Sequence, residues 1–470
     1  MYFRRFYCSV AIFAVCLSAN SSLWANNNGG GNNGGNNNGA NNNQGSQVTG
    51  GVEIDPQGVL RVMHGDPRLT YQRMRAAKQA LPQELARQSK LRKVSLNRLE
   101  AAIASKLEAG KPLDQEMLAL AGISRLEYVF FYPESGDIVF AGPAEGFARD
   151  SNNRLVGIDS GKPCLLLEDL AVALRAFPPQ GDTANTISVS IDPTQEGLAR
   201  MQKTLQQLGS ISSMNDVPIV VNALRQSLGL NDVTLTGVPR TTHFAHVLTE
   251  ADYRMKLIGI GLEAPPVPMV TYISRLASAP ANALIRWYFV PDYEAVACSP
   301  DGHAMQLVGR GLKLVGEDEL VNSDGTRRTS GRSANPASKA YTTDFTKKFE
   351  AVADNSLIYS QLRNLVDLTI AAAFVQDRKF YSTAGWNQGV LGSEDQLPVE
   401  VLPAPRQVET AINAVIKGSR LITPIGGGVL IQAKHALKSE NIRGDEDGSI
   451  LKTRDAQNLV AIPADSWWWD

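Results

Sequence analysis

The chain has 470 residues, of which 43% are hydrophobic and 20% are charged, as in an ordinary globular protein. This composition excludes a largely disordered chain, a collagen-like fibre and a small disulfide scaffold. Lys and Arg number 46 against 47 Asp and Glu, and the resulting net charge of −1 predicts no nucleic-acid partner.

Residues 1–25 have the layout of a secretory signal peptide. Arg4 and Arg5 provide a positive start, residues 10–17 are entirely apolar, and small and polar residues lead to a cleavage point after Ala25. The apolar run is shorter than the roughly 20 residues of a membrane span, and no later segment is long and apolar enough to span a bilayer. We therefore expect no transmembrane segment and an exported protein, located in the periplasm, at the cell surface or outside the cell.

Residues 26–50 are predicted to form a disordered Asn/Gly-rich linker. Positions 26–45 contain 11 Asn and 7 Gly, which offer almost nothing to bury and lose much backbone entropy on ordering. A self-associating Asn-rich tract is the alternative, but the many glycines favour a flexible tether.

The remaining chain is predicted to have an α+β fold of mixed strands and helices. Residues 51–122 form a mainly helical N-terminal region, residues 123–281 an α+β region and residues 282–470 a second α+β region. The two α+β regions are either separate or one continuous unit.

Periodicity places the main elements. A helix over residues 95–109 follows from an apolar residue at every third or fourth position, with Ser95 as its N-cap. Next come a hairpin over residues 126–141, a strand over residues 186–191 and a long helix over residues 241–259. Farther along, residues 408–417 are predicted to be helical, and the run of three glycines at 426–428 is expected to break a strand pair.

Two cysteines remain after removal of the signal peptide, which contains Cys8 and Cys16. Cys164 and Cys298 each lie in an apolar, strand-like context. In an oxidising compartment they can form a disulfide. Two buried free thiols are the alternative, because Cys is often a small core residue.

Three residues of the 241–259 helix are the candidate metal ligands. Their spacing places His243, His246 and Glu250 within a sector of roughly 60° on a helix. Two imidazoles and a carboxylate can hold Zn²⁺ or another divalent ion, which would activate water. In the alternative interpretation these residues border a buried face, where His246 donates to a backbone carbonyl and Glu250 pairs with Arg254.

Three segments resemble a known family. They are RLEYVFFYPESGDIVFAGPAEGF, the helix EDLAVALRAF and TEADYRMKLIGIGLE. From Ile123 to about Lys434 the chain resembles a family of uncharacterised secreted proteins found mainly in planctomycete bacteria. The resemblance implies export and a single family unit over this range, and it implies no activity, ligand or active site.

The sequence contains no Gly-x-Ser-x-Gly, His-Glu-x-x-His or Cys-x-x-Cys motif. The first functional prediction is therefore an exported binding or structural module with a cell-envelope protein or a glycan as partner. The tandem tryptophans at 467–469 could stack on sugar rings, or the tail could dock on its own domain. The alternative function is a metal-dependent hydrolase built on the His-x-x-His-x-x-x-Glu helix.

Overall fold

The computed structural model describes most of the chain beyond the predicted linker. The described residues are 48–49, 51–208, 217–275, 286–292, 296–316, 319–321, 327–329, 336–413, 426–456, 459, 462–463 and 465–470. The predicted signal peptide and most of the linker lie outside them. Val48–Thr49 form β1, which pairs with β2 (Val52–Ile54), so sheet pairing begins two residues before the predicted end of the linker.

The predicted α+β fold is confirmed, with most described strands in two large sheets. The nine-stranded sheet has, in spatial order, β1, β2, β3 (Val59–Val62), β17 (Gln407–Glu409), β10 (Leu230–Thr236), β9 (Ile187–Pro193), β18 (Gly426–Ile431), β11 (Arg286–Pro291) and β14 (Leu312–Gly316). The seven-stranded sheet has β19 (Ile442–Gly444), β12 (Val296–Cys298), β13 (Ala304–Leu307), β5 (Tyr128–Tyr132), β6 (Asp137–Ala144), β4 (Ser89–Ser95) and β20 (Trp468–Trp469). Two further pairs are β7 (Phe147–Arg149) with β8 (Leu155–Gly157) and β15 (Glu319–Val321) with β16 (Arg327–Thr329).

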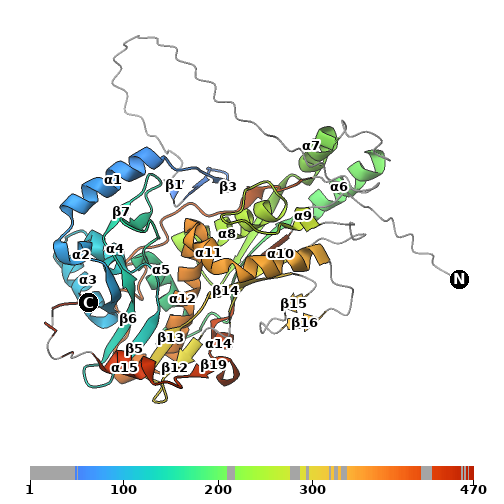
Figure 1. Ribbon diagram of the computed structural model, residues 1–470. Helices are drawn as coiled ribbons and strands as arrows, with labels where there is room; N and C mark the ends of the chain where they lie inside the picture. The colour runs from blue at the N-terminus through green and yellow to red at the C-terminus, as the bar shows by residue number, and fades with distance from the viewer. Residues whose placement is uncertain are drawn as a thin grey trace, which may run out of the picture.

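The described helices cover the sheets and fill the space between them (Figure 1). Before β11 they are α1 (Pro67–Ala80), α2 (Gln83–Ala86), α3 (Leu96–Glu108), α4 (Gln115–Leu118), α5 (Leu167–Ala176), α6 (Gln195–Leu208), α7 (Val217–Leu228), α8 (His243–Gly259) and α9 (Tyr272–Arg275). After β14 they are α10 (Pro336–Lys347), α11 (Phe349–Asp354), α12 (Leu357–Asp377), α13 (Phe380–Ala384), α14 (Ala433–Ala436) and α15 (Ser449–Asp455), and two 3₁₀ turns lie at Leu120–Gly122 and Ser439–Asn441.

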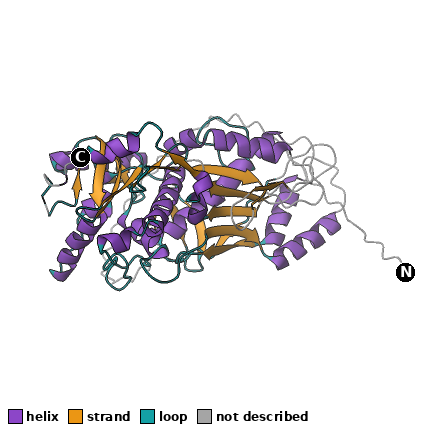
Figure 2. Ribbon diagram, turned by 90° about the horizontal axis from the view of Figure 1, so that it is seen from below, coloured by secondary structure: helices purple, strands orange, loops and turns teal. Residues whose placement is uncertain are grey.

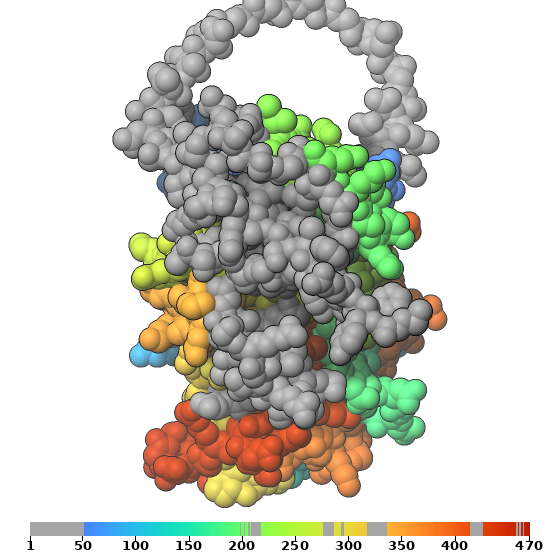
Figure 3. Space-filling model, turned by 90° about the vertical axis from the view of Figure 1, so that its right-hand side faces the viewer, coloured from blue at the N-terminus to red at the C-terminus, as the bar shows by residue number. Residues whose placement is uncertain are grey.

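Strands from all three predicted regions of the mature chain meet in each large sheet. In Figure 2 the strands gather in two groups, with helices between them. On the face shown in Figure 3, the red segment that includes α15 lies at the base, and α15 packs against β13.

Helix α12 is the centre of the core. Every residue from Ile358 to Val375 is buried, because α5, α8, α11, α13 and α14 pack around it. A helix that is enclosed on all sides needs an apolar surface all round. The polar side chains that α12 nevertheless carries, such as Gln361, are therefore candidates for a site.

The three glycines at 426–428 do not break a strand pair, and that expectation is wrong. They begin β18, which lies between β9 and β11. Gly427 has φ +127°, and a Cβ there would lie 1.8 Å from the carbonyl oxygen of Trp287 on β11. Only glycine allows this close approach of neighbouring backbones.

The predicted helix over residues 408–417 is also wrong at its start. Residues 407–409 form β17, which pairs parallel with β3 and antiparallel with β10. Sheet partners on both sides override the local helical pattern. Residues 414–417 lie outside the described part of the chain.

The C-terminal tryptophans are docked on the fold. Trp467 is buried, and Trp468–Trp469 form β20 at the edge of the seven-stranded sheet, paired with β4. The guanidinium of the fully buried Arg92 lies 4.8 Å from the ring centroid of Trp468 and also binds Asp470, with Nε 2.8 Å from Oδ1. This arrangement matches the docked-tail alternative.

Cys164 and Cys298 are both buried free thiols, so the structure has no disulfide between them. Burial raises the pKa of each thiol, which keeps both protonated and unreactive. No described helix has the length and apolar character that crossing a bilayer requires.

Candidate functional site

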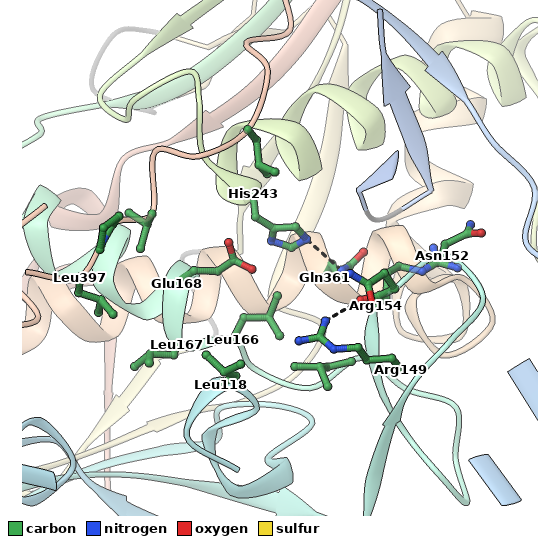
Figure 4. Close-up of a pocket in the computed structure, with 15 residues that line it drawn as sticks. Leu118, Arg149, Asn152, Arg154, Leu166, Leu167, Glu168, His243, Gln361 and Leu397 are labelled. Carbon is green, nitrogen blue, oxygen red and sulfur yellow. Dashed lines mark hydrogen bonds between the residues drawn. The ribbon is translucent and has the colours of Figure 1, made fainter. Parts of the chain in front are cut away.

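A pocket of about 350 Å³ lies where the starts of α5 and α8 meet α12 (Figure 4). The loop between β7 and β8 and the segment 397–402 complete its wall. Its lining residues are Leu118, Arg149, Asn152, Asn153, Arg154, Leu155, Leu166, Leu167, Glu168, His243, Gln361, Leu397, Pro398, Val399 and Leu402. Eight of these residues are apolar and seven are polar or charged, so the wall is more polar than that of most small-molecule sites.

Local capping places the first residue of α8 at the pocket. The Thr242 side chain accepts a hydrogen bond from the Ala245 amide at 3.2 Å, so the helix begins at His243. The Leu402 amide donates to the Thr241 carbonyl at 2.9 Å and holds the segment 397–402 beside this helix start.

The β7–β8 loop is shaped by Asp150. Its Oδ1 atom accepts from the amides of Asn152 and Arg154, each at 2.9 Å. Asn153 adopts φ +65°, a left-handed conformation that Asn tolerates well. The turn directs the Asn153 carbonyl toward Arg149, whose Nη1 donates to it at 2.9 Å.

His243 forms a buried ion pair with Asp169 in the first turn of α5. The Nδ1 atom lies 2.9 Å from Oδ2 and 3.0 Å from Oδ1 of Asp169. Burial alone would lower the pKa of His243, but the charge and hydrogen bond of Asp169 outweigh it, so the pKa rises to about 9. At neutral pH the imidazole is therefore a cation that donates from both nitrogens.

Gln361 faces the other nitrogen of this imidazole. The amide nitrogen lies 3.4 Å from His243 Nε2, and the amide oxygen has no hydrogen-bond partner among the described residues. A charged imidazole needs an acceptor at Nε2, so turning the amide by 180° satisfies both groups at once. His243 is thus held between Asp169 and Gln361.

Glu168 and Arg149 are the two charged side chains of the pocket that remain open. Figure 4 shows the Glu168 carboxylate and the Arg149 guanidinium pointing inward from opposite sides. Within the described chain, Glu168 makes no side-chain hydrogen bond or ion pair, and Arg149 bonds only the Asn153 carbonyl. Burial raises the pKa of Glu168, while the charges of His243 and Arg149 oppose that rise.

The three predicted metal ligands are each engaged separately. His243 pairs with Asp169, His246 Nε2 donates to the Pro403 carbonyl at 2.7 Å, and Glu250 accepts from Arg254 at 3.2 Å. Burial lowers the pKa of His246 to about 4 and raises that of Glu250 to about 7.

This arrangement is that of the alternative interpretation, in which the three residues border a buried face. The described residues contain no group of three or more His, Cys, Asp and Glu side chains placed to hold a metal ion. The geometry therefore gives the predicted metal site no support.

Sequence reasoning missed four residues of the site: Arg149, Glu168, Asp169 and Gln361. The only local signal was the acidic pair that opens the EDLAVALRAF helix. Asp169 and His243 are 74 positions apart, and Gln361 follows His243 by 118 positions. No spacing rule connects residues at such separations.

Residues 189–272 match the family model described as protein of unknown function (DUF1598). Comparison with curated proteins and with solved structures gives no match. The matched segment runs from β9 through α8 to the start of α9 and includes His243, whereas Arg149, Glu168, Asp169 and Gln361 lie outside it. The chain therefore contains a domain of unknown function, and its pocket combines that domain with residues from the rest of the fold.

Proposed function

We propose that this protein is an exported binding module that holds a small organic molecule in the pocket between α5, α8 and α12. One observation carries the proposal: Glu168 and Arg149 face the same cavity with unused hydrogen-bonding capacity, and six leucines contribute to the wall around them. Such a combination orients a ligand through its polar groups and binds it through its apolar surface.

The role of His243 in this proposal is to build the site. Its nitrogens face Asp169 and Gln361, so the imidazole supports the wall and adds positive charge, and it is not poised to accept a proton. None of the described lining residues is Ser, Thr, Cys, Lys or Tyr. These features favour recognition over covalent catalysis as the use of the pocket.

Export rests on the signal-peptide layout of residues 1–25 and on the resemblance to secreted proteins over residues 123–434. The match to the family of unknown function falls within that range. We place the protein in the periplasm, at the cell surface or outside the cell. Fractionation of cells that express the full chain tests this placement, and retention of the protein in the cytoplasm would overturn it.

A ligand panel tests the binding function. Purified residues 26–470 are titrated with amino acids, short peptides, carboxylic acids, amines and sugars, and binding is followed by calorimetry and by native mass spectrometry. We expect one class to bind and Glu168→Gln to weaken that binding at least about 10-fold. Glu196→Gln, an exposed change on α6, is the matched control. The binding function is wrong if no class binds or if both variants bind like the wild type.

A further inference from the structure

We infer that the ligand of this pocket is a zwitterion with an apolar body, meaning an amino acid with an aliphatic side chain or a short peptide of such residues. The inference rests on the proposed binding function and names its ligand class.

Two ion pairs lie in and beside the pocket, and in each of them the positive and the negative charge neutralise each other. Asp169 is bonded to His243, and Asp150 Oδ2 accepts from Arg154 Nε at 2.7 Å. Asp150 and Asp169 are both buried, so these pairs are part of the wall and are not free to turn toward a ligand. A ligand therefore meets the positive and negative charge that remain.

The remaining charges are one carboxylate and one guanidinium. Glu168 and Arg149 point inward from opposite sides and form no ion pair with each other (Figure 4). A monoanion on Arg149 would leave the Glu168 carboxylate enclosed without a hydrogen-bond donor, and a monocation on Glu168 would leave Arg149 with the Asn153 carbonyl as its single acceptor among the described residues. Enclosing an unpaired charge is costly, so a ligand with both charges is favoured over a ligand with one.

Each open group suits a particular half of a zwitterion. An ammonium group carries three N–H donors for the oxygens of Glu168. A carboxylate can accept two parallel hydrogen bonds from a guanidinium, and Arg149 uses only its Nη1 for the Asn153 carbonyl. The two ends of the ligand are thereby distinguished, which fixes its direction across the pocket.

Eight of the other thirteen lining residues are aliphatic, and the remaining five are Asn152, Asn153, Arg154, His243 and Gln361. Figure 4 shows Leu118, Leu166, Leu167 and Leu397 on the same side of the pocket as Glu168. The segment 397–402 adds Pro398, Val399 and Leu402. A side chain such as that of leucine is stabilised by burying its methylene and methyl groups against these residues, whereas glycine has no side chain to bury there.

The test uses residues 26–470 with five probes: L-leucine, L-leucyl-L-leucine, glycine, N-acetyl-L-leucine and L-leucinamide. N-acetyl-L-leucine lacks the ammonium group, and leucinamide lacks the carboxylate. We expect leucine or its dipeptide to bind at least about 10-fold more tightly than glycine and than both capped compounds in calorimetry. Tighter binding of leucine would identify the ligand as a free amino acid, and tighter binding of the dipeptide would identify it as a peptide.

Paired variants locate the two contacts. Glu168→Gln should weaken binding of the zwitterion at least about 10-fold and should not weaken N-acetyl-L-leucine, which gains because the charge that it left unpaired is gone. Arg149→Gln should likewise weaken the zwitterion at least about 10-fold and should not weaken leucinamide. A variant that merely misfolds would weaken every probe, so these selective losses separate contact from folding. Glu196→Gln and the exposed Arg75→Gln are matched controls.

The outcomes separate this inference from the binding function. Equal binding of leucine and either capped compound overturns the zwitterion, as does an unchanged affinity in both variants. Binding of a sugar, simple acid or amine instead overturns the ligand class and leaves the binding function intact. No binding by any class of the wider panel overturns both.

Discussion

The Nδ1 atom of His243 lies 2.9 Å from Oδ2 of Asp169, and this contact joins the first residue of α8 to the first turn of α5. Both side chains are almost fully buried. The pair therefore controls the charge of the imidazole and the fit of two helices at the pocket wall.

Asp169→Asn should lower the pKa of His243 well below about 9. Once the Asp169 charge is removed, burial favours the neutral imidazole and is opposed only by the charges of Glu168 and Glu250. NMR titration of the His243 ring protons measures this change. Asp395→Asn, an exposed substitution, serves as the control and should leave the titration in place. A pKa that stays near 9 in Asp169→Asn would refute the role of this pair.

The same pair predicts how stability depends on pH. The pKa of His243 is higher in the folded state than in the unfolded state. The charged imidazole therefore contributes its full stabilisation of the fold below about pH 6.5, and this stabilisation is lost as pH rises through about 9. We compare the unfolding free energies of the wild type and His243→Gln. Their difference should be larger at pH 6 than at pH 9.5 by on the order of 2 kcal/mol. Urea unfolding of both proteins across this range measures it, and parallel curves would contradict the prediction.

Gly427→Ala should destabilise the nine-stranded sheet by about 3 kcal/mol or more, or prevent folding. The added Cβ would lie 1.8 Å from the Trp287 carbonyl oxygen at a φ of +127°. Gly444→Ala is the matched control, since a Cβ there meets no atom within 4 Å, and we expect a change below about 1 kcal/mol. Thermal unfolding compares the two, and equal melting temperatures would show that β18 tolerates a side chain.

Asp470→Asn should cost roughly 1–3 kcal/mol of stability, because it removes the negative charge that faces the fully buried Arg92. Glu409→Gln breaks an exposed contact of 3.9 Å with Arg61 and should cost less than about 0.5 kcal/mol. Chemical denaturation of both variants separates the two cases.

Deletion of residues 467–470 should reduce stability without changing any glycan binding, whereas selective loss of glycan binding would restore the sugar-stacking interpretation.

Treatment with a chelator should leave the melting temperature unchanged, because His243, His246 and Glu250 are each bonded to a different protein partner. Elemental analysis of the purified protein before and after treatment provides the second measurement. Stoichiometric Zn, Mn or Fe that is lost in His243→Ala/His246→Ala would revive the metal-dependent hydrolase.

The sequence by itself determined the features that depend on near neighbours. Alternation and helical periodicity predicted the α+β class, the β5–β6 hairpin and α8, and Ser95 caps α3 as its position indicated. The same periodicity placed His243, His246 and Glu250 on one helix, and local chemistry offered the carbonyl and Arg254 partners as an alternative to metal. These inferences succeed because backbone geometry relates residues within one or two turns.

Only the tertiary structure decided what those residues contact. Asp169 and Gln361 reach His243 because α5 and α12 pack against α8. Glu168 and Arg149 point into the same pocket from α5 and from the end of β7. The sequence predicts that Gly427 interrupts a strand pair. In the structure β11 approaches its backbone so closely that no residue other than glycine fits at this position of β18. Packing between distant segments is set by the summed burial of the whole core, which no short spacing encodes, so the pocket and its charges emerge only when the chain is folded.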